Sequence, residues 1–161
     1  MDRPSGVRLW CSMAMGPKFD DWSVTPEKTA EAVRRIVAFA DPLQVILFGS
    51  RARGDARTGS DLDLAVIVDA PEEVVRRRVP HSVLRGLRME VSLVAVSREK
   101  FDLYRPWQNS IFHHIDREGI VLYDRADTES ARADAVQAGV SGVHLLVLCD
   151  QLPAPFFGKV F

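Results

Sequence analysis

The residues best suited to chemistry lie in two short segments, Gly49-Ser50 and the acidic stretch from Ser60 to Asp63. Asp61 and Asp63 are two positions apart in an apolar run that predicts a buried strand, so their carboxylates project from the same face. Two carboxylates on one face can bind divalent cations, and Mg²⁺ prefers such oxygen ligands. Metals held in this way stabilise the attacking and leaving oxygens when phosphoryl or nucleotidyl groups are transferred. The spacing therefore predicts a metal-dependent site for phosphate chemistry.

The Gly49-Ser50 pair ends another apolar run and is suited to hold phosphate. Glycine lets the backbone come close to a ligand, and Ser50 offers a hydroxyl and a main-chain N–H at the start of a helix. The guanidinium groups of Arg51 and Arg53 can neutralise phosphate charge, although an exposed arginine needs no ligand to explain it. Either segment alone is a weak signal. Their occurrence in order, each beside its own strand, favours a triphosphate site.

Residues 48–54, F-G-S-R-A-R-G, and residues 60–64, S-D-L-D-L, resemble the signature of minimal nucleotidyltransferases in the DNA polymerase β-like superfamily. The resemblance extends over residues 27–124 and implies an α/β (α+β) fold with a mixed β-sheet flanked by helices. The implied reaction transfers a nucleoside monophosphate, AMP in the case of ATP, to a hydroxyl and releases pyrophosphate. The resemblance also implies two Mg²⁺ ions at the catalytic residues Asp61 and Asp63, with the nucleotide bound by Gly49, Ser50, Arg51, Arg53 and Ser60.

The third carboxylate of the family is the point where this sequence departs from the resemblance. In the family it lies on the next core strand and helps to deprotonate the acceptor hydroxyl. Aligning the apolar run of residues 89–96 places Ser92 at that position. Glu90 lies on the same face two residues earlier, about 6.5 Å along the strand. Three alternatives follow: a different register lets Glu90 serve as the catalytic carboxylate, Asp69 substitutes from the neighbouring strand, or the site binds nucleotide and turns over poorly.

Three functions are compatible with these residues. The first, favoured by the resemblance and the short chain, is an antitoxin-type adenylyltransferase that transfers AMP to an all-helical HEPN ribonuclease toxin. The second is a nucleotidyltransferase that acts on a small molecule such as an aminoglycoside, although such family members generally carry an additional domain for the acceptor. The third is a nucleotide-binding module without catalysis, which Ser92 in place of the carboxylate favours.

Helices and strands that alternate along the chain must position these residues. Capping residues and periodicity predict an amphipathic helix from Thr25 to Ala40, a helical region over 71–87 that Pro80 breaks or kinks, and a helix over 108–117. Short apolar runs predict strands over 45–48, 62–68, 89–96 and 120–123.

The pattern divides the chain into three parts. Residues 1–24 mix Gly, Pro, Ser and Trp without a period and predict an irregular N-terminal arm. The nucleotidyltransferase domain is expected over 25–124, followed by a C-terminal extension over 125–161 with a helix near 128–138. The apolar Pro155-Phe156-Phe157 of this extension is expected to pack on the domain or to meet a partner.

Composition narrows the class of protein. A chain of 161 residues with 47% hydrophobic and 27% charged residues is typical of one soluble globular domain. The 21 basic and 22 acidic residues give a formal charge of -1, so no overall basic field attracts nucleic acid. Apolar runs are far shorter than the roughly 20 residues that cross a bilayer, and no signal-peptide pattern is seen. Cys11 and Cys149 indicate neither a disulfide framework nor a zinc site, so a cytoplasmic protein is expected.

Overall fold

The computed structural model describes residues 21–130 and contains one four-stranded sheet. The strands are β1 (Gln44–Phe48), β2 (Leu62–Val68), β3 (Val91–Ser97) and β4 (Ile120–Asp124). Their order is β3-β2-β1-β4; β1 pairs antiparallel with both β2 and β4, whereas β2 and β3 are parallel. The predicted mixed sheet is therefore confirmed.

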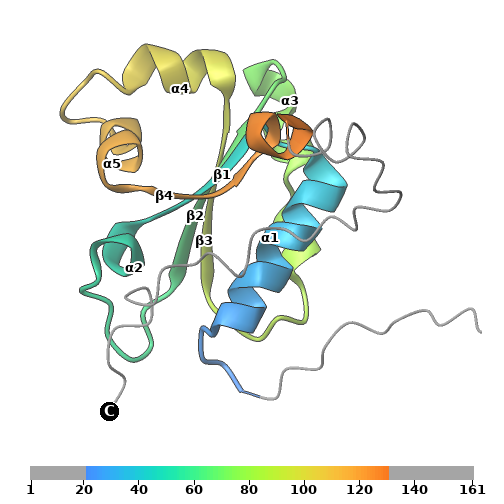
Figure 1. Cartoon of the computed structure of the whole chain (residues 1–161), viewed down its shortest axis with the longest axis vertical. Helices are drawn as coiled ribbons and strands as arrows, with labels where there is room; N and C mark the ends of the chain where they lie inside the picture. The colour runs from blue at the N-terminus through green and yellow to red at the C-terminus, as the bar shows by residue number, and fades with distance from the viewer. Residues whose placement is uncertain (1–20, 131–161) are drawn as a thin grey trace, which may run out of the picture.

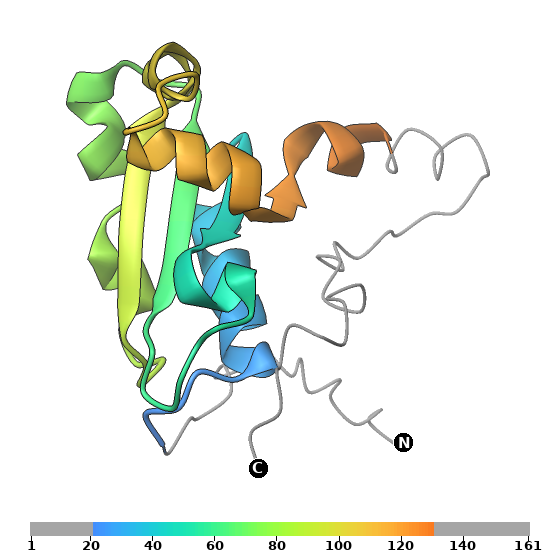
Figure 2. The same ribbon diagram turned by 90° about the vertical axis from the view of Figure 1, so that its left-hand side faces the viewer.

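Helices cover both faces of this sheet (Figures 1 and 2). α1 packs on one face together with α3 and the short 3₁₀ helix η1, and α4 and α5 pack on the other face. The very short α2 connects β1 to the loop before β2. The bounds are α1 (Pro26–Ala40), α2 (Gly49–Arg53), α3 (Glu72–Arg78), η1 (His81–Leu84), α4 (Arg98–Tyr104) and α5 (Ile111–Glu118).

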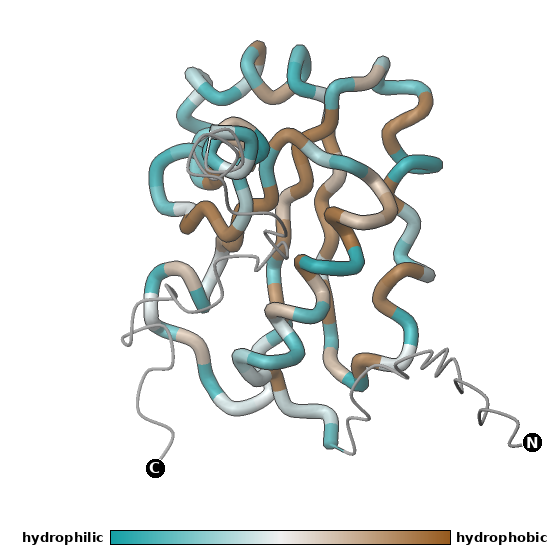
Figure 3. The backbone as a smooth tube through the Cα atoms, turned by 45° about the vertical axis from the view of Figure 1, so that its right-hand side comes forward, coloured by the Kyte–Doolittle hydropathy of each residue, from teal (hydrophilic) through white to brown (hydrophobic). Residues whose placement is uncertain are grey.

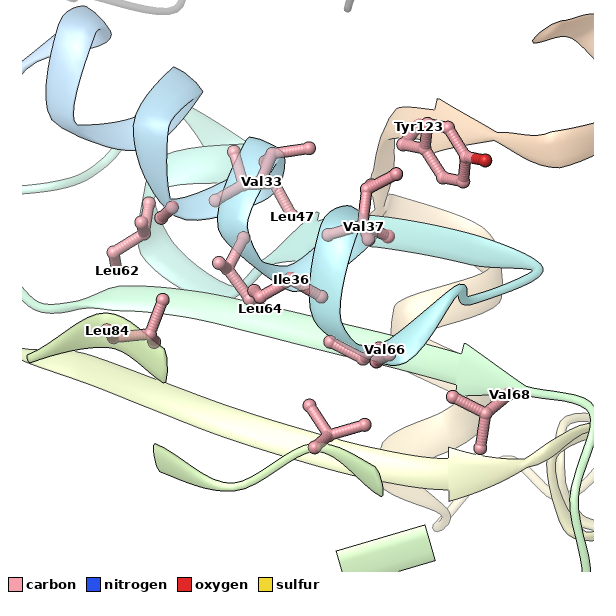
Figure 4. Close-up of a cluster of buried hydrophobic side chains, with 14 of the residues drawn as sticks. Val33, Ile36, Val37, Leu47, Leu62, Leu64, Val66, Val68, Leu84 and Tyr123 are labelled. Atoms are coloured by element: carbon pink, nitrogen blue, oxygen red, sulfur yellow. The ribbon is translucent and has the colours of Figure 1, made fainter. Parts of the chain in front are cut away.

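α1 forms where the sequence predicts it. The Thr25 side chain caps its first turn by accepting a hydrogen bond of 3.3 Å from the Lys28 amide, and Pro26 occupies the first turn, where no partner for a backbone N–H is needed. The helix ends at Asp41, which adopts a left-handed conformation with φ 45° just before Pro42. Its apolar stripe packs against the sheet in the larger of two cores (Figure 4).

The alternation of side chains along β2 separates the two cores. Leu64, Val66 and Val68 face α1 (Figure 4), whereas Ala65 and Ile67 face α4 and α5. Asp63 shares the face of Ala65 and Ile67, and it is the one residue of β2 that is not buried. The face of the sheet that carries Asp63 is thus the face that α4 and α5 cover.

The helical region over 71–87 is divided at Pro80 into α3 and η1, as predicted. Three other elements, β3, α5 and α4, differ from the sequence prediction. β3 begins at Val91 rather than at residue 89, and α5 begins at Ile111 because the Ser110 side chain caps it. α4 was not predicted; Ser97 caps it by accepting a hydrogen bond of 3.2 Å from the Lys100 amide.

Apolar residues concentrate in the strands, and the helices alternate between polar and apolar positions (Figure 3). Over residues 21–130, no helix is both long and apolar enough to cross a membrane. The greater part of the predicted N-terminal arm, most of the helix expected near 128–138, and Pro155-Phe156-Phe157 lie outside the described residues.

Candidate active site

Gly49 and Asp63 are packed against each other at the junction of β1 and β2. The antiparallel register pairs Phe48 with Asp63, which brings the Asp63 side chain over the first residue of α2. Gly49 has φ +71°, and a Cβ atom added there would lie 2.9 Å from Asp63 Cγ and still closer to Oδ2. Only glycine fits both the backbone conformation and the space. The turn and the carboxylate predicted to share a ligand are therefore adjacent.

Asp61 and Asp63 form the acidic centre of the site. Asp61 is exposed just before β2, whereas Asp63 is partly buried. Burial, followed by repulsion from Asp61, raises the pKa of Asp63 above its ordinary value, and the Ser92 side chain, Arg53 and Arg51 partly offset this rise. Such repulsion is the environment that a divalent cation relieves.

The donor set fits Mg²⁺ only if substrate oxygens complete its coordination. Within residues 21–130 no group of three or more His, Cys, Asp or Glu side chains is arranged to hold a metal ion. Mg²⁺ in nucleotide sites is commonly bound by one or two carboxylates together with phosphate oxygens and water. Asp61 and Asp63 supply that number of carboxylates beside the turn expected to receive phosphate.

Arg51 lies against the loop that precedes β2. Its Nε donates a hydrogen bond of 3.0 Å to the Asp61 carbonyl, and Nη2 donates one of 2.6 Å to the Ser60 carbonyl. Burial lowers the pKa of this guanidinium, and the charges of Asp61 and Asp63 act in the opposite direction. Arg51 thus holds the two residues that lead into the acidic strand.

The remaining residues predicted to bind the nucleotide lie in α2 and the adjoining loop. Ser50 is half-buried in the first turn of α2, beside Gly49. The Ser60 Oγ accepts a hydrogen bond of 2.9 Å from the Arg57 amide and so closes the loop. Arg53, at the end of α2, is exposed and lies between two carboxylates, 3.4 Å from Asp55 and 3.6 Å from Glu118.

The parallel register of β2 and β3 pairs Asp63 with Ser92. Ser92 therefore occupies the strand position beside Asp63 where the resemblance implies a third carboxylate. Glu90 lies one residue before β3, is exposed, and accepts a hydrogen bond of 2.8 Å from the Leu62 amide through its carbonyl. Asp69 follows the opposite end of β2, about 20 Å from Asp63 along the strand, too distant to share one cation with it.

Sequence reasoning missed Glu118, which reaches the site from α5. No pattern in the neighbouring sequence indicates that Glu118 lies near the site, because its contact with Arg53 joins residues that are far apart in the chain. The only available signal was its place directly after the helix predicted over 108–117. Two surface cavities, of about 380 Å³ between α1 and η1 and of about 180 Å³ between β1, α4 and α5, do not include Asp61 or Asp63.

A mixed sheet in which a Gly-Ser turn meets the strand carboxylate Asp63, with Asp61 just before that strand, is the arrangement expected of a nucleotidyltransferase. The family model described as "Polymerase beta, Nucleotidyltransferase" matches residues 31–128, more than half of the chain. The chain belongs to this family. No curated protein matches its sequence significantly.

Three solved structures are similar at low sequence identity. A protein from Sulfolobus solfataricus assigned as a nucleotidyltransferase is 19% identical, with 63% of this chain and 81% of that chain covered and a TM-score of 0.44. A toxin–antitoxin structure with AMP-PNP is 19% identical (72% and 87% covered, TM-score 0.42). A mutant of the toxin–antitoxin MntA-HpeT is 18% identical (72% and 87% covered, TM-score 0.41). The assignment rests on the family model.

Proposed function

We propose that this chain is a Mg²⁺-dependent adenylyltransferase that transfers AMP from ATP to a hydroxyl of a HEPN-type toxin in the cytoplasm. The observation that carries the nucleotide site is the contact between Gly49 and Asp63, which joins the phosphate turn to the acidic strand. Asp61 supplies the second carboxylate on the approach to the same strand.

The reaction begins with the triphosphate seated at the β1–α2 turn. Gly49 allows the phosphates to approach the backbone, and the Ser50 hydroxyl and main-chain N–H donate to their oxygens. Asp61 and Asp63 would hold Mg²⁺, which supplies charge neutralisation for the attacking and leaving oxygens. The acceptor oxygen forms a bond to the α-phosphorus, the bond to the bridging oxygen breaks, and pyrophosphate leaves.

The proton of the acceptor hydroxyl needs a base, and Glu90 is our candidate. Ser92, the residue beside Asp63, cannot accept this proton as a carboxylate would. Glu90 precedes Ser92 by two residues, and its exposed side chain has the freedom to turn towards the acceptor. General-base assistance contributes about 10²- to 10⁴-fold to the rate.

A protein acceptor is supported by exposed apolar side chains on and between α4 and α5, which cover the sheet face that carries Asp63. Leu103 in α4, Trp107 in the loop, and Ile111 in α5 recur every fourth residue, and all three are exposed. Apolar surface of this kind is typical of sites that a partner protein covers. The resemblance of residues 48–64 to minimal nucleotidyltransferases makes a HEPN-type toxin the partner we propose.

The nucleotide site is tested by calorimetry with ATP and Mg²⁺. Asp61→Asn together with Asp63→Asn should abolish magnesium-dependent affinity, because both carboxylates are lost. Asp69→Asn is the control, since it removes one carboxylate charge at the other end of β2. Unchanged affinity in the double variant, with the fold intact by circular dichroism, would show that the site is wrongly placed.

The acceptor and the base are tested together with labelled ATP. Incubation with a purified HEPN-type protein should transfer one AMP, seen by mass spectrometry, whereas an aminoglycoside should stay unmodified. Glu90→Gln should slow the transfer by about 10²- to 10⁴-fold with ATP affinity nearly unchanged. A Glu90→Gln variant that transfers AMP at the native rate excludes Glu90 as the base. Modification of the aminoglycoside but not of the HEPN-type protein excludes the protein acceptor.

A nucleotide-binding module without catalysis is the second candidate, and the pairing of Ser92 with Asp63 favours it. The two candidates differ in their response to Ser92→Asp, which places a carboxylate beside Asp63. A transfer rate that rises with Ser92→Asp, while Glu90→Gln has no effect, indicates an enzyme in which Glu90 is not the base. Binding of ATP without transfer in the native protein, in Glu90→Gln and in Ser92→Asp indicates the module.

A further inference from the structure

α5 contributes a carboxylate to the neighbourhood of the predicted phosphate site. α5 packs beside α2 (Figure 2), and Glu118 Oε2 lies 3.6 Å from Arg53 Nη1. On its other side, Arg53 Nε lies 3.4 Å from Asp55 Oδ2. Glu118 Oε1 in turn lies 3.3 Å from His114 Nδ1. A chain of polar contacts thus runs from α5 to the last residue of α2.

The two arginines of α2 differ in what their guanidinium groups contact. Arg51 uses Nε and Nη2 in hydrogen bonds to the Ser60 and Asp61 carbonyls, so much of its donor capacity is already committed to the protein. Arg53 makes one long hydrogen bond, to Asp55, and its side chain is 47% exposed. Its charge also helps to lower the pKa of Asp63 against the larger effects of burial and Asp61, which places it within electrostatic range of the acidic centre. Arg53 is therefore better suited than Arg51 to bind the triphosphate.

The contact with Glu118 orients Arg53 without consuming a donor. At 3.6 Å the pair is beyond hydrogen-bond length, so the Nη1 protons remain available to phosphate oxygens while the carboxylate attracts the cation. The hydrogen bond with His114 lowers the pKa of Glu118 against the opposing effect of burial, and the charges of His114 and Arg53 lower it further. Orientation in advance of binding reduces the entropy that a long side chain loses when it contacts a ligand.

We propose that Glu118 is a positioning residue that holds Arg53 ready for the phosphates of the nucleotide bound at the β1–α2 turn. This inference rests on the proposed nucleotide site. It assigns α5 a part in substrate binding through an arginine of another helix.

Removing the Glu118 charge should change ATP affinity in opposite directions under the two possible roles of this residue, so the sign of the change distinguishes them. If Glu118 only adds negative charge near a triphosphate, Glu118→Gln should leave affinity unchanged or strengthen it, because repulsion falls. If Glu118 positions Arg53, the same variant should weaken affinity. The effect of an exposed ion pair is small, so we expect a rise in Kd of about 1.5- to 5-fold.

Asp116→Asn is the matched control in the same helix. Asp116 is 38% exposed and lies 3.5 Å from Arg105, whereas Glu118 is 39% exposed and lies 3.6 Å from Arg53. Two residues apart in a helix point about 200° apart, so Asp116 loses the same charge on a different side of α5. Its variant should not weaken ATP binding.

The experiment measures the Kd of ATP with Mg²⁺ by calorimetry for the native chain, Glu118→Gln, Asp116→Asn, Arg53→Gln and the double variant Arg53→Gln with Glu118→Gln. We expect Glu118→Gln to raise Kd by up to about 5-fold in the native background and by nothing in the Arg53→Gln background, because the effect requires Arg53. Native-like ATP affinity of Glu118→Gln, or an equal loss of affinity in Asp116→Asn, overturns this inference and leaves the proposed nucleotide site unaffected. A native chain that does not bind ATP overturns the proposed site and this inference with it.

Discussion

Gly49 and Asp63 are packed so closely that no side chain fits at position 49, and the variant Gly49→Ala tests what this contact contributes. Gly49→Ala places a methyl group 2.9 Å from Asp63 Cγ at φ +71°, so the carboxylate must move. We expect a loss of about 1–2 kcal/mol in the free energy of unfolding from the left-handed conformation and a much weaker ATP affinity from the displaced carboxylate.

Gly54→Ala controls for the backbone effect. Gly54 has φ +78°, and no atom lies within 4 Å of its added Cβ. Both variants should lose similar stability in chemical denaturation, but only Gly49→Ala should lose magnesium-dependent ATP binding in calorimetry. Equal binding in the two variants would mean that Asp63 need not hold its position.

The environment of Asp63 predicts that the free energy of unfolding of the metal-free protein depends on pH. Burial, followed by Asp61, raises the pKa of Asp63 above its ordinary value of 3.8. A pKa that is higher in the folded state means that stability present below pH 3.8 is lost as the pH rises through the folded pKa. Ionised Asp63 therefore destabilises the fold at pH 7.

Asp63→Asn removes this destabilisation. With a chelator present, we expect its melting temperature at pH 7 to exceed that of the native protein, and the gain should shrink as the pH falls towards 3.8. Asp69→Asn, at the exposed end of β2, should show no comparable gain. A lower melting temperature for Asp63→Asn at pH 7 would contradict the destabilising role.

The same residues show how far sequence can predict a site. The approach of Gly49 to Asp63 was predictable, because a glycine turn and a strand carboxylate that share a ligand must lie close together. Asp61 was expected on the same strand as Asp63, but β2 begins only at Leu62. The different contacts of Arg51 and Arg53 were not predictable. They depend on where the carbonyls of Ser60 and Asp61 lie after the loop folds, and neighbouring sequence does not encode that position.

At the scale of elements, Lys28 joins α1 to the segment before β3. Its buried ammonium donates to the carbonyls of Asp21 (2.7 Å), Ser23 (2.6 Å) and Arg88 (3.2 Å), and to the Asp21 carboxylate (2.6 Å). Lys28→Met keeps the apolar stem and leaves these carbonyls without the charged donor. Hydrogen bonds to charged groups contribute about 1.5–3 kcal/mol, so we expect a loss of that order in the free energy of unfolding by urea titration.

Arg34→Met provides a comparison within α1. Arg34 is exposed and pairs with Glu31, which keeps a second partner in Arg35, so its loss should cost at most about 1 kcal/mol. If Lys28→Met costs no more than Arg34→Met, Lys28 does not anchor the approach to β3.

Elements were predictable from sequence where local signals agree. α1 has a capping threonine, a proline at its start and a continuous apolar stripe, and its predicted and observed ends coincide. α4 was missed because its seven residues bury only Phe101 and so carry too short a periodic signal. β3 starts at Val91 because pairing with Leu62 of β2 sets its beginning, and such pairing is tertiary information.

For the whole molecule, ligand binding should appear as thermal stabilisation. A ligand that binds only the folded state at 100 times its Kd adds about 2.7 kcal/mol of stability. ATP with Mg²⁺ should therefore raise the melting temperature by about 6–10 °C for a domain of this size. Neither component alone should do so, because Asp61 and Asp63 repel the anionic triphosphate, and Mg²⁺ alone lacks the phosphate oxygens that complete its coordination.

The combined Asp61→Asn and Asp63→Asn variant is the control for this measurement. Its melting temperature should not respond to ATP with Mg²⁺ under the same conditions. An equal rise in native and variant proteins would indicate binding elsewhere, for example in one of the two surface cavities that do not include these carboxylates.

The loop between α2 and β2 has a consequence for how this architecture can vary and be engineered. The pairing of Phe48 with Asp63 sets the distance between the Gly49-Ser50 turn and β2. This distance therefore does not depend on the length of the loop between α2 and β2. Ala56 and Thr58 are exposed, and a Cβ on Gly59 would meet nothing within 4 Å. Natural insertions, or a fluorophore attached at Thr58, can be accommodated there while the strands preserve the active geometry.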